Sequence, residues 1–190
     1  RPFIAWPLPQ EVEQEVGRIG FFLKQIGGRV RWVARESIHL TARFLGDTDE
    51  KLVGALKELI NRVASESRAT TLTIEKLGAF PDFKRPRVIW AGLGGDTSPL
   101  QATADLIERD VCELGFAPEP KKFKPHLTLG RVKDSHGVEA LMMAVQQFRP
   151  SPMAVVLDRL VLFKSTLTPQ GSIYERVHER VFSASDTFGG

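Results

Sequence analysis

The sequence predicts an α+β fold of two similar lobes, each an antiparallel sheet backed by helices, with an active-site cleft between them. Three observations predict it. Helical patterns mix with hairpin-like strand pairs, unlike the regular alternation of a doubly wound parallel sheet. A His-Leu-Thr tripeptide occurs twice, about half a chain apart. Similar segments surround both copies, so we expect residues 1–190 to form a single two-lobed domain with an internal repeat and a pseudo-two-fold axis.

Composition limits the class of protein. The 190 residues are 42% hydrophobic and 26% charged, which suits a compact core and excludes disorder over most of the chain. One cysteine, Cys112, excludes an intrachain disulfide and a cysteine-based zinc site. No apolar run approaches a membrane span and no secretory leader is evident, so we expect a cytoplasmic protein. The net charge of +3 permits an anionic ligand such as RNA.

The first third of the chain predicts a strand, a helix and two further strands. The apolar run Phe3–Leu8 reads as a strand before Pro9. Apolar residues at helical spacing from Val12 to Ile26 predict a helix, which Gly27-Gly28 ends. Strands are then expected at 30–33 and 37–45, the second ended by a Gly-Asp pair.

The middle of the chain continues with a helix, a strand pair and another helix. Asp47 or Thr48 can cap a helix that reaches Val63. Strands near 71–80 and 88–93 are joined by the turn-rich segment 81–86, and a helix runs from 96–98 to 114, before Gly115.

The last third opens with the basic, proline-rich loop 118–125. It leads into a strand at 126–132 and a helix at 138–148. Strands at 154–165 and 173–182 flank the turn formed by Pro169, Gln170 and Gly171.

The internal repeat is centred on segments 37–47 and 124–134. Ser37–Phe44 can be laid on Lys124–Arg131, and an aspartate follows the histidine by eight residues in both copies, Asp47 and Asp134. Each copy then has a helix and an acidic-basic-Leu strand, at 75–80 and 158–163. Duplicated cores require repeated apolar residues but not repeated polar ones, so the paired histidines and threonines indicate a shared function.

Strand alternation predicts how each copy presents its polar groups. Side chains alternate between the two faces of a strand, so His39 and Thr41 share one face while Leu40 points to the other. His126 and Thr128 repeat the arrangement. If the lobes face each other, two imidazoles and two hydroxyls line one site.

Two histidines beside one ligand suit acid–base chemistry at phosphorus. With an ordinary pKa near 6.5, one imidazole can act as a general acid while the other acts as a general base. Displacement at phosphorus needs a base for the incoming oxygen and an acid for the leaving one, and threonine hydroxyls can donate to the phosphoryl oxygens. The scheme needs no metal or cofactor. The alternative, a zinc site, lacks a third ligand in any recognisable pattern.

Other polar residues are candidates for binding groups or for ordinary surface. Arg43 shares the parity of His39 and so is a candidate for the site, the alternative being a surface ion pair. Arg131 has the opposite parity unless Gly130 marks a bulge. His136 and His178 are expected to be solvated, Cys112 to be a small core residue, and Lys121, Lys122 and Lys124 to form a basic loop suited to an RNA backbone.

These motifs resemble a known family, the RNA 2',3'-cyclic phosphodiesterases or 2'-5' RNA ligases of the two-histidine phosphoesterase superfamily. The resemblance covers nearly the whole chain. It rests on the opening Phe3–Pro9, on Trp32 through Gly46 with the first motif, on 77–81 and 85–92, on Phe123–Arg131 with the second motif, and on the tail from Lys164-Ser165 to Tyr174. Ala42 stands where the family usually has a larger aliphatic residue.

The resemblance implies metal-independent hydrolysis of a terminal RNA 2',3'-cyclic phosphate to a 2'-phosphomonoester. His39 matches the family's proton donor to the 3'-oxygen and His126 its proton acceptor from water, with Thr41 and Thr128 holding the phosphate and Arg131 near the nucleotide. The reverse reaction is ATP-independent 2'-5' ligation. We expect RNA or oligonucleotide ends as partners, no membrane, no cofactor and a monomer.

Two alternatives remain from the sequence. One is a module that binds a nucleotide or RNA end without turnover, and the other is a phosphodiesterase for a small cyclic nucleotide-sugar phosphate. The residues themselves do not distinguish acid from base, an assignment that rests on the resemblance.

Overall fold

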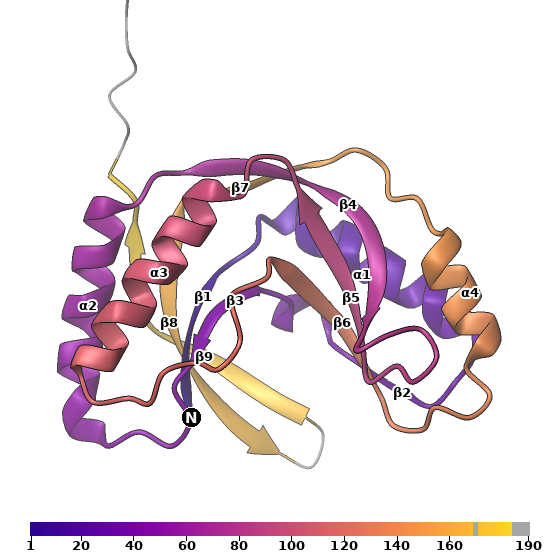
Figure 1. Ribbon diagram of the computed structural model, residues 1–190, viewed down its shortest axis with the longest axis horizontal. Helices are drawn as coiled ribbons and strands as arrows, with labels where there is room; N and C mark the ends of the chain where they lie inside the picture. Colours follow the sequence, from indigo (N-terminus) through magenta and orange to yellow (C-terminus); the bar gives the residue numbers. More distant parts are fainter. Residues whose placement is uncertain (169–170, 184–190) are drawn as a thin grey trace, which may run out of the picture.

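The computed structural model describes residues 1–168 and 171–183 of the chain. The elements, in order, are β1 (Pro2–Trp6), α1 (Gln10–Ile26), β2 (Val30–Trp32), η1 (Arg35–Ser37), β3 (Leu40–Phe44), η2 (Glu50–Leu52), α2 (Val53–Glu66), β4 (Thr70–Phe80), β5 (Val88–Gly94), α3 (Ser98–Glu113), β6 (His126–Val132), α4 (Glu139–Gln147), β7 (Ala154–Leu157), β8 (Arg159–Thr168) and β9 (Gly171–Val181). Figure 1 shows their arrangement.

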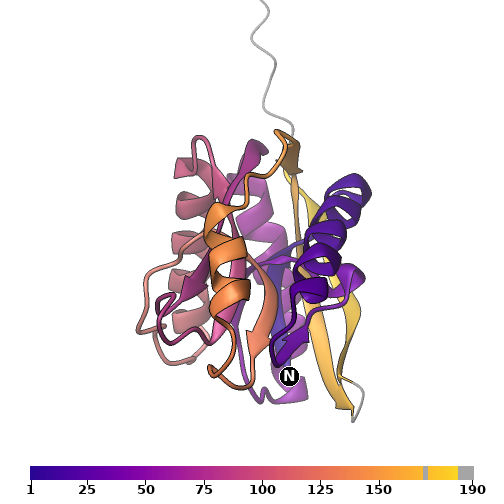
Figure 2. The ribbon, with the colours of Figure 1, turned by 90° about the vertical axis from the view of Figure 1, so that its right-hand side faces the viewer.

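Two antiparallel sheets lie between two pairs of helices (Figure 1). The first sheet has the order β3-β1-β8-β9 and is covered on its outer face by α2 and α3. The second has the order β2-β6-β5-β4-β7 and is covered by α1 and α4, which lie side by side in Figure 2. The prediction of two lobes, each an antiparallel sheet backed by helices, is confirmed.

The two copies of the repeat exchange strands between the sheets. In the first sheet β1 pairs with β3 and β8, and in the second β5 pairs with β6 and β4. Thus β1 corresponds to β5, β3 to β6, and β8 to β4. The strand after each copy's second helix crosses to the opposite sheet, so each sheet is built from both halves of the chain.

Amphipathic patterns account for how the helices pack. In α1 the residues that face the second sheet are fully or nearly fully buried: Val12, Val16, Ile19 and Leu23. The α1 helix ends at Gly27, whose φ of 108° suits a residue without a Cβ. The buried faces of both sheets and all four helices join one continuous apolar core. None of the helices in the described part of the chain is long and apolar enough to span a membrane.

Among the expected boundaries that differ, three concern a change of sheet, the first motif and a helix cap. The strand predicted at 154–165 breaks at Asp158, where the chain leaves β4 in one sheet and joins β1 in the other. The strand predicted from residue 37 begins at Leu40, after a short 3-10 turn. Asp49, rather than Asp47 or Thr48, caps the segment before α2, because its carboxylate accepts a hydrogen bond from the Lys51 amide. Pro169 and Gln170 of the predicted turn lie outside the described residues.

Candidate functional site

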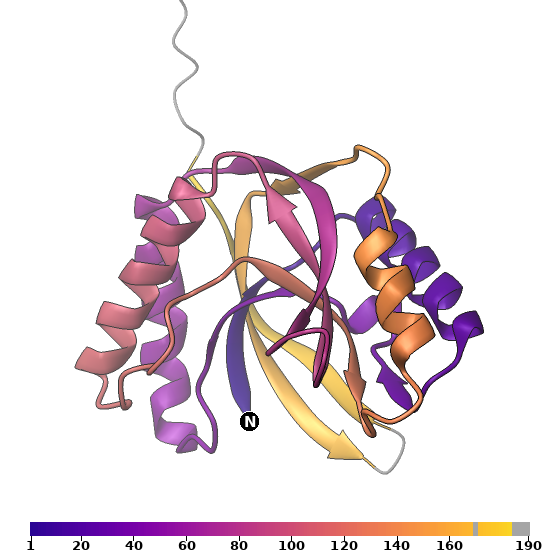
Figure 3. The same cartoon turned by 45° about the vertical axis from the view of Figure 1, so that its right-hand side comes forward.

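The two His-Leu-Thr motifs begin at neighbouring points of the molecule. Cα atoms of β3 and β6 approach within 8 Å, and the starts of the two strands lie side by side in Figures 1 and 3. Two further contacts link the strands next to each motif. The rings of Trp6 and Phe123 are 5.6 Å apart, and the Val33 amide donates to the Leu129 carbonyl at 2.9 Å. The two motifs, 87 residues apart in the sequence, therefore start close together in the fold.

Each histidine is oriented by the backbone two residues before it. Nδ1 of His126 lies 2.7 Å from the Lys124 carbonyl oxygen. A carbonyl only accepts hydrogen bonds, so Nδ1 carries the proton and Nε2 keeps its lone pair in the neutral ring. His39 forms the equivalent hydrogen bond to the backbone of Ser37. The repeat therefore extends to the hydrogen bond that fixes each imidazole.

The two threonines keep their hydroxyls free. Thr41 pairs with Ala5 on β1, and Thr128 pairs with Trp90 on β5, so both occupy the same position in equivalent ladders. Both are half-buried, and neither hydroxyl has a hydrogen-bond partner among the described residues. Each of these two unpartnered hydroxyl donors thus lies two residues along the chain from a motif histidine.

Aromatic side chains enclose His39. Its ring stacks on Phe3 with centroids 4.7 Å apart, meets Phe163 at 5.7 Å, and takes the edge of Tyr174 at 5.2 Å. Phe3 is only 1% exposed. Burial lowers the pKa of His39 to about 4, while the hydrogen bond to Ser37 opposes the change. In the unliganded protein the His39 imidazole is therefore neutral at pH 7.

His126 has a smaller aromatic border. Phe80 presents its ring edge-on to the imidazole at 5.2 Å, and Trp90 lies 5.0 Å from Phe80. Trp90 lies flat across β4 because Gly78 opposite it has no side chain, and a Cβ there would overlap the indole ring. None of these aromatic residues was predicted to lie beside the histidines. Phe3 lies two residues before Ala5, the partner of Thr41, and Trp90 is itself the partner of Thr128. Both aromatic side chains therefore lie on the faces of the threonines, and this placement is the signal that identifies them.

A β-bulge turns Arg43 away from the threonine. Thr41 pairs with Ala5, but Arg43 pairs with Ile4, so Ala42 is an extra residue in β3. An extra residue shifts the alternation by one, and Arg43 points to the face opposite Thr41. The prediction that it shares the face of the motif is wrong.

Arg43 instead fastens β3 to α3 and the loop that follows. Its guanidinium forms ion pairs with Glu108 at 2.7 Å and Glu119 at 3.1 Å, and it donates to the carbonyls of Phe44 and Ala117. The side chain is only 10% exposed. This is the ion-pair alternative, found in a nearly buried position rather than at the surface.

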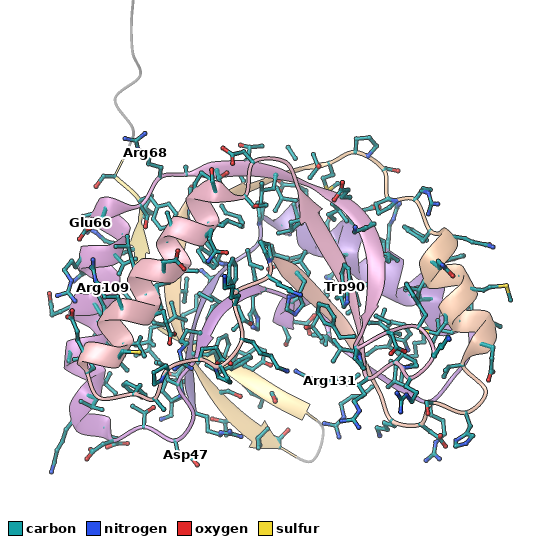
Figure 4. The ribbon with its side chains drawn as sticks, viewed as in Figure 1. Asp47, Glu66, Arg68, Trp90, Arg109 and Arg131 are labelled. Atoms are coloured by element: carbon teal, nitrogen blue, oxygen red, sulfur yellow. The ribbon has the colours of Figure 1, made fainter. Side chains whose placement is uncertain are left out.

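The equivalent bulge in β6 has the opposite effect on Arg131. Thr128 pairs with Trp90, whereas Gly130 pairs with Ile89, so Leu129 is the extra residue. Arg131 then returns to the face of Thr128 and is exposed. Figure 4 shows Arg131 and Trp90 on the same side of the second sheet. Its parity agrees with the condition set in the sequence analysis, a bulge beside Gly130.

The remaining candidates lie elsewhere. His136 is exposed as expected, with Nδ1 2.8 Å from Asp134, which raises the pKa of the imidazole. His178 is half-buried rather than solvated, and its Nε2 lies 2.8 Å from Asn61 Oδ1 on α2. Lys121, Lys122 and Lys124 are exposed in the loop before β6. Within residues 1–168 and 171–183 no group of three or more His, Cys, Asp or Glu side chains is arranged to hold a metal ion.

A cavity of about 320 Å³ lies between α1 and the segment that leads to the first motif. Trp32, Ile38 and Leu129 contribute to its lining. Ile38 and Leu129 are the sequence neighbours of His39 and Thr128, and neighbouring side chains of an extended chain point to opposite faces. The cavity that they line therefore lies on the face opposite the imidazoles. We therefore do not place the substrate there.

The family follows from a match over most of the chain. Residues 8–168 match the family model of the 2'-5' RNA ligase superfamily. The chain belongs to this superfamily. The match includes both histidine motifs, in agreement with the resemblance seen in the sequence.

Superfamily relatives and solved structures agree with this assignment. A Thermotoga maritima protein named RNA 2',3'-cyclic phosphodiesterase is 32% identical over 96% of this chain and 95% of its own length. A protein of the same name from Aeropyrum pernix is 33% identical over 86% and 94%. A crystal structure of a Thermus thermophilus protein has a TM-score of 0.79 at 24% identity, covering 96% of this chain and 97% of that one. Escherichia coli LigT complexed with 3'-AMP has a TM-score of 0.76 at 22% identity, covering 96% and 98%. The structural likenesses show the fold alone.

Proposed function

We propose that this protein hydrolyses the 2',3'-cyclic phosphate at the end of an RNA to a 2'-phosphomonoester. One observation carries the proposal. Two imidazole–hydroxyl pairs, each imidazole held by the backbone two residues earlier, stand at the adjoining starts of β3 and β6. The names of the relatives, RNA 2',3'-cyclic phosphodiesterase, support the same substrate class.

In the proposed reaction a water oxygen attacks phosphorus and the bond from phosphorus to the 3'-oxygen breaks. His126 takes the proton from water at Nε2, since its Nδ1 proton is committed to Lys124. His39 gives a proton to the departing 3'-oxygen. The hydroxyls of Thr41 and Thr128 donate to the phosphoryl oxygens, where charge persists through the transition state. Read backwards with a 5'-hydroxyl in place of water, the same steps join RNA ends by a 2'-5' bond.

The donor role requires that His39 be protonated when the substrate is bound. Its aromatic surroundings disfavour the charged ring in the free protein. A phosphodiester anion beside the ring favours the imidazolium by direct attraction in the same low-dielectric setting. Substrate binding and proton uptake are therefore coupled, and the acid forms where a phosphate is present.

The test is a product assay with RNA that ends in a 2',3'-cyclic phosphate. We expect a 2'-phosphate product, and turnover that is insensitive to EDTA. His39→Ala and His126→Ala should lower kcat by at least about 100-fold each, with near-native circular dichroism. The matched control is His136→Ala, which removes an exposed histidine outside the site. Near-native rates in either motif variant, or binding without any product, would refute the proposal.

The same proposal includes the cellular setting of the enzyme. We place it in the cytoplasm as a monomer that acts on RNA ends without a cofactor. Size-exclusion chromatography with light scattering checks the monomer, whose expected mass is that of the single 21.2 kDa chain.

A further inference from the structure

Two arginines stand directly opposite each other at the edge of the second sheet. Arg31 on β2 pairs with Arg131 on β6 in the antiparallel ladder. Paired residues of neighbouring strands share a face, so Arg31 lies on the face that carries Arg131 and, through the bulge, Thr128. Both arginines are exposed.

This pair has no acidic partner in the part of the chain that the structure describes. No ion pair or hydrogen bond of either guanidinium is formed with a described residue. The nearby Arg29 is different, since it lies 3.5 Å from Asp134. Like charges placed directly opposite on a sheet are destabilising. The arrangement therefore indicates an anion that binds between or across the two guanidinium groups.

The pair lies at a suitable distance from the reacting group. Arg131 stands two ladder positions beyond Thr128, which is about 7 Å along the strand. That separation is comparable with the spacing of neighbouring phosphates in an extended single strand. Arg31 lies on the neighbouring edge strand. The two arginines therefore form a row that extends from the motif threonine toward the edge of the sheet.

The facing sheet is different at the equivalent position. Phe44 of β3 corresponds to Arg131, because each follows a bulge and pairs with the residue two positions before the partner of its motif threonine. Phe44 is 56% exposed and lies 5.7 Å from Phe3. One sheet therefore offers aromatic surface and the other offers positive charge, which are the two components of single-stranded nucleic-acid binding sites.

We propose that Arg131 and Arg31 together hold the internucleotide phosphate that precedes the reacting end of the RNA. The inference rests on the proposed function and extends it from the terminal nucleotide to the strand behind it. Arg31 is then a residue that sets substrate length, because a mononucleotide has no second phosphate for it to contact. Substrates with at least one internucleotide phosphate are the preferred class.

The experiment compares a 2',3'-cyclic mononucleotide with a trinucleotide that ends in the same group. Arg31→Gln should reduce the trinucleotide's advantage in kcat/KM about 2- to 5-fold, as expected for one exposed ionic contact. The dependence of log(kcat/KM) on log salt for the trinucleotide should become shallower by about 0.7. Arg31→Lys should keep most of the salt dependence. The control is Lys24→Gln, which removes the same charge from an exposed site on α1.

The outcomes separate the inference from the proposed function. In one outcome, wild-type protein turns over both substrates while Arg31→Gln leaves the ratio of their kcat/KM values and the salt slope unchanged. In that case the proposed phosphate contact of Arg31 is refuted, and its charge merely protects a sheet edge. If wild-type protein turns over neither substrate, the proposed function fails. The phosphate contact of Arg31 is then tested by binding, measured as fluorescence anisotropy of a labelled trinucleotide bearing a 2'-phosphate. Weaker binding by Arg31→Gln than by Lys24→Gln supports it, and equal binding overturns it.

Discussion

The two motif histidines have the same local geometry but different surroundings. Both use the backbone two residues earlier as a hydrogen-bond partner. His39 is stacked on Phe3 and edged by Tyr174, whereas His126 contacts only the edge of Phe80 among the described aromatic rings. The pKa of His39 is thus lowered by burial against side chains that its own sheet supplies.

A first prediction concerns the titration of His39. The free protein should show a His39 ring resonance that titrates near pH 4, because burial disfavours the imidazolium. Adding a nucleoside 2'-monophosphate should move the midpoint upward, since the anion favours the charged ring. Nuclear magnetic resonance of ring-labelled protein measures both values, with exposed His136 as the internal reference. An ordinary midpoint near 6.5 in the free protein would contradict the desolvation argument.

A second prediction concerns the free hydroxyls. Thr128→Val keeps the shape of the side chain but removes a donor to the phosphoryl group, so kcat should fall about 10- to 100-fold. Thr128→Ser restores the hydroxyl and should recover most of the rate. Single-turnover kinetics distinguish this effect from altered binding. Equal rates for the valine and serine variants would exclude a hydrogen bond to the reacting group.

At the scale of strands, paired bulges decide which side chains reach the site. Each bulge follows the threonine of its motif and shifts the alternation by one residue. In β3 this directs Arg43 to Glu108 and α3, whereas in β6 it brings Arg131 back to the threonine's face. The same local device therefore gives one arginine a structural contact and the other an exposed position.

A third prediction concerns Arg43. Arg43→Met should lower the free energy of unfolding by about 1–3 kcal/mol, because two carboxylates of α3 and its loop lose their shared, nearly buried cation. Urea unfolding measures the loss, and a double-mutant cycle with Glu108→Gln isolates the pair. A coupling energy near zero would show that the contact contributes nothing to stability.

A fourth prediction concerns the glycine beneath Trp90. Gly78→Ala should displace the indole and reduce stability, because a Cβ has no space there. The shift is measured by tryptophan fluorescence and thermal unfolding. Gly20→Ala is the matched control: it lies in α1 with open space around it, and should be neutral or stabilising by up to about 1 kcal/mol. Identical behaviour of the two variants would contradict the packing account.

Across the whole molecule, both sheets contain strands from both halves of the chain. The first sheet needs β1 and β3 from the first half and β8 and β9 from the second, while β2 and β4 from the first half belong to the other sheet. One continuous apolar core runs through both. Neither half of the chain retains a complete sheet by itself.

A fifth prediction concerns the pH dependence of stability. His39 has a folded-state pKa of about 4 against about 6.5 when unfolded, so the unfolded chain binds the extra proton first as pH falls. His39 should therefore cost up to about 3 kcal/mol of stability between pH 6.5 and 4. Urea unfolding across this range should show the loss, and His39→Gln should remove it. An unchanged pH dependence in that variant would refute the assignment.

How much the sequence predicted depends on the range of the interactions. The shared face of His39 and Thr41 follows from local alternation and repetition, and both are properties of a few adjacent residues. The faces to which Arg43 and Arg131 point depend on bulges, which are set by hydrogen bonding to another strand. The aromatic enclosure of His39 joins β1, β8 and β9, and it is visible only once the strands are assembled.

The strand crossing at Asp158 was likewise hidden. An apolar run from 154 to 165 reads as one strand, because both of its parts alternate in the same way. The change of sheet depends on which edges are available to it, β4 on one side and β1 on the other.

The exchanged strands also explain why two copies in one chain differ from two copies in a dimer. A symmetric pair of identical subunits would place chemically indistinguishable imidazoles about its axis, with equal proton affinities. Covalent linkage lifts that constraint while the crossed strands preserve the juxtaposition. His39 can therefore acquire an aromatic enclosure, while the sheet that carries His126 acquires exposed arginines.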